Sequence, residues 1–165
     1  MTTTRRLSGI TQAVAAGALA GLAGATVMVV GEKIEQAITH RPNSYVPGRA
    51  LLTLLGRPTG DEAKPFVSNQ LMHYGTGAAL GALRGVWAVT GIRGIQANAW
   101  HTVVRLAFDQ TVENGTGVGA PPATWPSNER VLDVVHKAVF SVVTGVLADR
   151  ILPPVLASGR GRTSH

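Results

Sequence analysis

An uncharged stretch from Ala13 to Gly31 constrains the fold of this chain more than any other feature of its sequence. Extending the stretch back to Ile10 adds only one threonine and one glutamine. About 20 mostly apolar residues are enough to cross the hydrocarbon core of a bilayer as an α-helix. We therefore expect residues 10–31 to form a membrane-spanning helix that follows a short basic tail over residues 1–9.

A second apolar stretch runs from Tyr74 to Ile92 and contains a single charged residue, Arg84. Its length also suits a membrane span, so we expect a second spanning helix over residues 74–92. An arginine at the centre of a bilayer is costly unless an acidic side chain is near it. We expect Asp109 to be that partner, followed by Glu113 and Asp133. The alternative is a shorter or shifted span, in which Arg84 reaches the membrane interface.

Small residues recur every four positions in both apolar stretches, which places them on one face of each helix. They are Ala13, Gly17, Gly21 and Ala25 in the first stretch, and Gly77, Gly81 and Gly85 in the second. Such a face allows the backbone of another helix to approach closely. A simple bias toward alanine and glycine would produce part of the same pattern. We expect these glycines to pack helices together, within the chain or between copies of it.

The rest of the chain predicts further helices and no sheet. Residues 97–114 and 129–152 form two amphipathic segments, and residues 49–56 form a short helix suited to a membrane interface. The predicted fold class is therefore all-α: a membrane-associated bundle of about four helices with short interfacial helices. Residues 10–156 would form a single helical membrane domain, and residues 157–165 a basic, flexible tail.

Composition excludes several classes of protein. Charged residues make up only 15% of the chain, against about 25% in typical soluble domains. Cysteine is absent, which excludes disulfides, thiolate metal sites and cysteine nucleophiles. The net charge of +6 comes from dispersed residues, without the basic and aromatic pattern of a nucleic-acid module. We expect no nucleic-acid partner, no cofactor and no metal.

Three segments together resemble a known family. They are the glycine-rich segment MHYGTGAALGALRGV with His73, the PPATWP segment from Pro121 to Pro126, and HKAVFSVVTGVLADR from His136. The set resembles the uncharacterised bacterial inner-membrane proteins of the YagU type, over residues 70–152. The resemblance implies a small polytopic protein of the bacterial inner membrane. It carries no catalytic residues over to this chain.

A polar stripe runs along the third predicted helix. His101, Arg105, Asp109 and Glu113 follow one another at intervals of four residues, which keeps them on one slowly turning face of a helix. Inside a bundle this stripe would suit a proton path, an ion path or a ligand site. On a solvated face it would only be a ladder of ion pairs that stabilises the helix. Both interpretations stay open at this point.

Other ionisable residues extend the candidate intramembrane cluster. Asp133 and His136 are spaced like one half of a carboxylate-bridged metal site, but such a site needs two similar pairs. We therefore expect no metal ligands and no catalytic residues. The full candidate cluster is Arg84, His101, Arg105, Asp109, Glu113, Asp133 and His136.

These features predict an integral, multi-pass protein of the cell membrane with a structural, interaction or transport role. Its partners would be the lipid bilayer and further copies of the chain, which would associate through the glycine faces. One alternative is an exported soluble helical protein whose N-terminal signal is cleaved. A second alternative is a membrane-bound enzyme that uses the stripe from His101 to Glu113.

Overall fold

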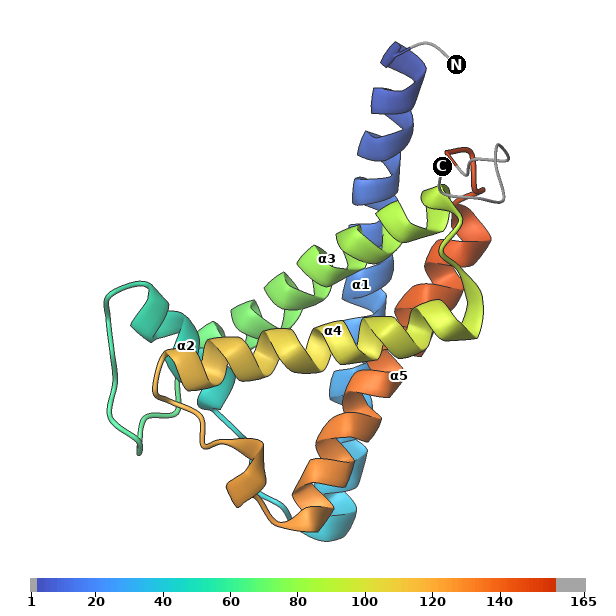
Figure 1. Ribbon diagram of the computed structural model, residues 1–165. Helices are drawn as coiled ribbons and strands as arrows, with labels where there is room; N and C mark the ends of the chain where they lie inside the picture. The colour runs from blue at the N-terminus through green and yellow to red at the C-terminus, as the bar shows by residue number, and fades with distance from the viewer. Residues whose placement is uncertain (1–2, 157–165) are drawn as a thin grey trace.

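The computed structural model describes residues 3–156 and is entirely helical within them. Five α-helices and one short 3-10 helix follow one another along the chain (Figure 1). They are α1 (Thr3–Thr39), α2 (Val46–Leu54), α3 (Phe66–Thr90), α4 (Gly94–Gly115), η1 (Pro122–Thr124) and α5 (Ser127–Ile151). The predicted all-α class is confirmed. Residues 3–9, which we expected to be a tail, form the first turns of α1, and the predicted tail over residues 157–165 lies outside the described residues.

The helix α1 is the longest element, and α3 and α5 both run antiparallel to it. Gly17 and Gly21 of α1 lie against Gly81 and Gly77 of α3, so the residue numbers decrease on one helix as they increase on the other. In Figure 1, α3 crosses α1 obliquely, and α4 lies across α5. The short helix α2 packs beside α3, at the end of the molecule where α4 finishes.

The contact between α1 and α3 is a direct approach of two backbones. A Cβ atom added to Gly81 would lie 2.5 Å from the Cα atom of Gly21. A Cβ atom added to Gly17 would lie 2.8 Å from the Cα atom of Gly85, and one added to Gly77 would lie 2.8 Å from the Cβ atom of Ala25. Real Cβ contacts are essentially never that short. Glycine is therefore required along this crossing because no side chain fits between the helices.

The helix α5 packs closely against α1 and α4 at two more glycines, which were not among the predicted packing positions. A Cβ atom added to Gly24 of α1 would collide with Thr144 and Phe140 of α5. A Cβ atom added to Gly145 of α5 would collide with Asn98 of α4. Gly24 follows Ala16 and Ala20 at intervals of four, and Gly145 follows Ser141, but the helices that these positions meet could be recognised only in the assembled structure.

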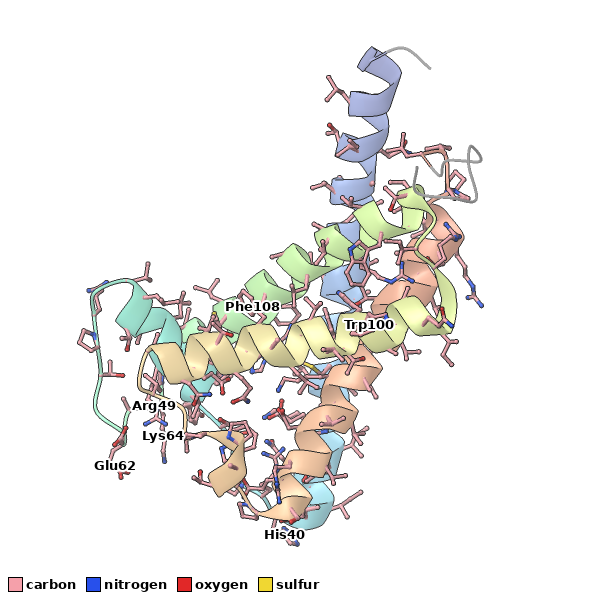
Figure 2. The ribbon with its side chains drawn as sticks, viewed as in Figure 1. His40, Arg49, Glu62, Lys64, Trp100 and Phe108 are labelled. Atoms are coloured by element: carbon pink, nitrogen blue, oxygen red, sulfur yellow. The ribbon has the colours of Figure 1, made fainter. Side chains whose placement is uncertain are left out.

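The interior is built mainly from alanine, glycine and polar residues. The buried apolar side chains larger than alanine are Met28, Leu80, Val89, Phe140 and Leu152, among the described residues. Large apolar side chains lie on the outside instead. Leu19 and Ile38 of α1 are 67% and 74% exposed, and Figure 2 shows Trp100 and Phe108 on the outer side of α4. Soluble proteins place their large apolar side chains the other way round.

Two helices of the described chain are long and apolar enough to cross a membrane: Leu7–Thr39 within α1, and α5. The first contains the span that we expected over residues 10–31. The second expected span, over residues 74–92, lies in α3, which does not reach this level. Its glycines add little hydrophobicity, and α3 also begins with polar residues such as Asn69 and His73.

The close crossing of α1 and α3 predicts that Gly81→Ala destabilises the fold by about 1–3 kcal/mol, as overpacking does elsewhere. The matched control is Gly75→Ala on the same helix, where an added Cβ atom would meet nothing within 4 Å. Alanine favours helix over glycine, so the control should be neutral or up to about 1 kcal/mol more stable. Thermal unfolding in detergent measures both. Equal melting temperatures for the two variants would contradict the crossing.

Candidate functional site

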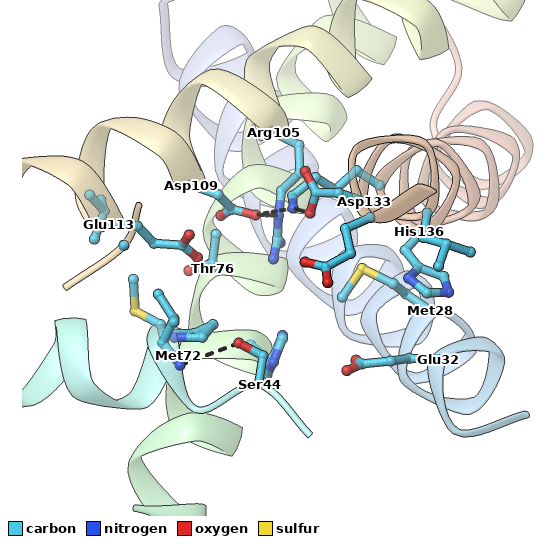
Figure 3. Close-up of a pocket in the computed structure, with 18 of the residues that line it drawn as sticks. Met28, Glu32, Ser44, Met72, Thr76, Arg105, Asp109, Glu113, Asp133 and His136 are labelled. Atoms are coloured by element: carbon cyan, nitrogen blue, oxygen red, sulfur yellow. Dashed lines mark hydrogen bonds and ion pairs between the residues drawn. The ribbon is translucent and has the colours of Figure 1, made fainter. Parts of the chain in front are cut away.

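A cavity of about 380 Å³ lies between the second half of α4, the first half of α5, the C-terminal part of α1 and the start of α3. Among the residues that line it are five that the sequence singled out: Arg105, Asp109, Glu113, Asp133 and His136. Figure 3 shows these side chains, with Glu32 and Met28 of α1, around one shared space. The structure thus brings together most of the predicted polar cluster.

Two local patterns place these residues. On α4 the spacing of four residues keeps Arg105, Asp109 and Glu113 on the face that turns toward α5 and α3. On α5, Asp133 and Lys137 are also four residues apart and form an ion pair. Because α4 crosses α5, the two charged faces meet at the cavity.

The charges of the cavity are partly neutralised by ion pairs within it. Asp109 accepts a hydrogen bond from Nε of Arg105, over 2.9 Å, and its carboxylate lies 3.5 Å from Nζ of Lys137. Lys137 is shared with Asp133. The Arg105 guanidinium also lies 4.9 Å from the ring centroid of Phe140, a cation–π contact. Asp109 is therefore held by two cations and belongs to the frame of the cavity.

Glu113 has a different environment. Its carboxyl makes no hydrogen bond or ion pair within the described part of the chain. Burial raises the pKa of Glu113 to about 7, and the carboxylates of Asp109 and Asp133 add to the rise, against an opposing effect of Lys137. This carboxyl is therefore close to half-protonated at neutral pH.

Two buried nitrogen atoms at the cavity also have no hydrogen-bond partner: Nη1 of Arg105 and Nδ1 of His73. The Arg105 residue is only 3% exposed. Burial lowers the pKa of His73, so its ring is neutral near pH 7. Buried polar groups normally have partners. The wall of the cavity thus contains an unpaired guanidinium nitrogen, an unpaired imidazole nitrogen and an unpaired carboxyl.

The first residue of the predicted stripe, His101, does not belong to the cavity. It is fully buried, and its Nε2 donates a hydrogen bond to the carbonyl of Leu80 over 3.0 Å. Its ring stacks on Phe140 and meets the edge of Trp87. His101 lies about one turn before Arg105, the first α4 residue that lines the cavity, and about three turns before Glu113.

The prediction that Arg84 pairs with Asp109 is wrong: its partner is Asp149 of α5. The Nη2 atom of Arg84 lies 2.8 Å from Oδ2 of Asp149 and donates a second hydrogen bond to Asn98 over 3.1 Å. The physical reason is the short turn between α3 and α4. A residue six positions before the end of α3 meets the start of α4, where Asn98 lies, whereas Asp109 is near the far end of that helix.

Asp149 closes a second polar cluster, which the sequence analysis did not identify. Its Oδ2 also accepts a hydrogen bond from the backbone N–H of Gly94, the first residue of α4, over 2.9 Å. The side chain of Arg93 donates to the backbone carbonyls of Asp149 and Leu152. One carboxylate therefore ties the turn between α3 and α4 to the end of α5.

Several cavity residues were not in the predicted cluster, and most of them come from distant segments. They are Met28, Glu32, Arg41, His73, Trp125, Glu129 and Lys137, among others. Trp125 lies in the PPATWP segment, which contributes to the YagU resemblance but contains no ionisable residue that would indicate a site. Within the described residues, no group of three or more histidine or acidic side chains is arranged to hold a metal ion.

Comparison with protein-family models, with curated proteins and with solved structures finds no match to this chain. The similarity to the YagU type therefore stays a prediction from the sequence.

The cluster around Asp149 predicts strong coupling between Arg84 and Asp149. Arg84→Leu and Asp149→Leu should each destabilise by about 3–5 kcal/mol, because each leaves a buried charge without its partner. The double variant should cost less than the sum by about 0.5–3 kcal/mol. Unfolding by denaturant in detergent gives these free energies. The cycle of Arg84→Leu with Asp109→Leu is the control and should be additive; strong coupling there would contradict the assignment.

The raised pKa of Glu113 predicts a pH-dependent difference between the wild type and Glu113→Gln. The native state retains the Glu113 proton above pH 4.5, where the unfolded state loses it, so stability falls as pH rises toward 7. Glutamine carries no such proton. The variant should therefore gain up to about 3 kcal/mol relative to the wild type between pH 4.5 and pH 8. A pH-independent difference in melting temperature would show that Glu113 titrates normally.

Proposed function

We propose that the protein is a multi-pass integral membrane protein in which α1 and α5 cross the bilayer. In this arrangement the helices hold the polar cavity at one boundary of the membrane, where a small polar solute binds. The role is binding or passage of a solute, with no catalytic step.

The observation that carries the proposal is the distribution of polarity. The buried interior contains Arg84, Asn98, His101 and Arg105, whereas the outer faces of α1 and α5 carry exposed leucine, isoleucine and valine. Hydrocarbon around the helices accounts for both facts, because it accepts apolar side chains and forces polar groups inward. In water the same exposed surface would cause association.

The charges along the two helices support a position for the membrane. The uncharged part of α1 ends at Glu32, and the uncharged part of α5 begins at Ala138, after Lys137. Both of these charged residues line the cavity. Since α1 and α5 are antiparallel, the cavity lies at one end of both spans. Arg5, Arg6 and Arg150 lie at the other end, whereas Lys33, Arg41, Arg130 and Lys137 lie at the cavity end, so the positive-inside rule assigns neither end to the cytoplasm.

The two alternatives have weaker support. Cleavage of an export signal would remove the part of α1 that fills the glycine face of α3, at Gly77, Gly81 and Gly85. Such a cut would expose the core, so α1 suits a permanent helix better than a signal. An enzyme based on the stripe would need its histidine at the cavity, and His101 is instead bonded to a backbone carbonyl.

The absence of cysteine allows a direct test by single-cysteine labelling. Leu19→Cys and Ile38→Cys place a thiol at two similarly exposed positions of α1, 67% and 74% exposed. If α1 crosses the bilayer, a water-soluble maleimide added to opened membranes should label Ile38→Cys and leave Leu19→Cys unlabelled. A thiol in hydrocarbon does not ionise, so Leu19→Cys does not react there. Unfolding in sodium dodecyl sulfate should allow both cysteines to react.

The result that contradicts the proposal is equal labelling of both cysteines before detergent. Two further measurements accompany the test. The protein should remain in the membrane pellet after extraction with high-pH carbonate, and the intact mass should retain residues 10–31. Release by carbonate, or loss of those residues, would favour the exported alternative.

A further inference from the structure

We infer that the cavity binds a small zwitterion, a solute whose ammonium group and carboxylate are joined by an apolar stem, as in an ω-amino acid. This inference deepens the proposed function by naming the class of solute. It rests on the cavity and does not depend on whether α1 and α5 lie in a bilayer.

The unpaired guanidinium nitrogen of Arg105 indicates an anionic group on the ligand. Arg105 lines the cavity and is only 3% exposed. Its Nε donates a hydrogen bond to Asp109, whereas its Nη1 has no hydrogen-bond partner. Figure 3 shows its side chain extending into the space between Asp109 and Thr76. A guanidinium N–H is only a donor, so its missing partner is an acceptor. Arginine prefers carboxylate or phosphate oxygens in that role.

Acidic side chains outnumber arginine and lysine in the lining of the cavity. Glu32, Asp109, Glu113, Glu129 and Asp133 line the cavity, against the cations Arg41, Arg105 and Lys137. Arg41 is itself engaged 2.7 Å from Glu35, which lies outside the lining. Glu113 and Glu129 have no ion-pair partner within the described chain. The unbalanced negative charge favours a ligand with a positive group.

The Arg105 guanidinium and the Glu113 carboxyl do not neutralise each other. Arg105 and Glu113 lie eight residues apart on one face of α4, which is about 12 Å along the helix axis. Asp109 occupies the position between them and holds Nε of Arg105. A ligand with charges at both ends can therefore satisfy the guanidinium and the carboxyl at once, which no ion pair within α4 does.

Size and wall chemistry fit this class of solute. A volume of about 380 Å³ lies within the usual range of small-molecule sites. Met28, Met72, Val112, Trp125 and Leu132 form apolar parts of the wall, which suits a methylene stem. A purely anionic ligand would face the five carboxylates. Lys137 already occupies the position of a cation between Asp109 and Asp133, and its charge would repel a bare metal ion.

The test is a binding titration on the purified full chain in detergent with two sets of probes. Each set compares an ω-amino acid with its singly charged analogues: 6-aminohexanoate with hexanoate and hexylamine, and 4-aminobutyrate with butyrate and butylamine. The inference predicts that at least one amino acid binds ten-fold or more tightly than both of its analogues. The inference is overturned if, in both sets, the amine or the simple carboxylate binds as tightly as the amino acid. It is also overturned if no probe binds.

Variants identify the two ends of the site. Glu113→Gln removes the carboxylate and should weaken the amino acid ten-fold or more, while the affinity for the simple carboxylate stays equal or rises. Arg105→Lys keeps a cation beside Asp109 but removes the guanidinium fork, so it should weaken the amino acid and the simple carboxylate alike. If both variants leave the amino-acid affinity unchanged, the solute binds elsewhere and the inference is wrong.

The matched control is Glu62→Gln, the same chemical change on an exposed loop far from the cavity (Figure 2). It should leave all affinities unchanged. Melting temperatures of the variants establish that each is folded. If Arg105→Lys is unstable, Glu113→Gln alone decides the test. Loss of binding with normal cysteine labelling would overturn this inference alone, whereas binding together with equal cysteine labelling would overturn only the membrane placement.

Discussion

The close approach of α1 and α3 is the constraint on which the rest of the structure depends. Because the glycines of the two helices face each other without side chains, the backbones meet at Gly21 and Gly81 and fix the angle of crossing. Glycines bury little apolar area, so this contact is held by many weak dispersion contacts between backbone atoms. It leaves the opposite face of α1 uncovered, which is why Leu19 and Ile38 point outward.

From this crossing, the polar interior divides into two sites at opposite ends of α4. At the start of α4, Asn98 and the backbone of Gly94 form hydrogen bonds with Arg84 and Asp149. Near its end, Asp109 and Glu113 face an open cavity. The first cluster ties α3, α4 and α5 together.

The sequence predicted features that depend on spacing within one helix. The glycine positions and the stripe from Arg105 to Glu113 follow from a repeat of four residues, and the structure places them on shared faces. Contacts between helices were harder, because they depend on crossing angles that a sequence does not encode locally. The choice of Asp109 for Arg84 failed for this reason. The short turn between α3 and α4 brings Arg84 to the start of α4, at Asn98, and leaves Asp109 near the far end of that helix.

The two interpretations of the α4 stripe apply to different residues in it. Asp109 and Glu113 are both carboxylates on one face, one turn apart, so their intrinsic chemistry is nearly the same. Asp109 lies between Arg105 and Lys137 and is fully neutralised, which is the ion-pair ladder expected of a structural stripe. Glu113 receives neither cation, since Lys137 is committed to Asp109 and Asp133. A protein selected for stability alone has little reason to keep such a partly buried carboxyl, because a neutral residue there avoids the cost of desolvation. Glu113 is therefore the position where a role in binding explains the residue better than a role in folding.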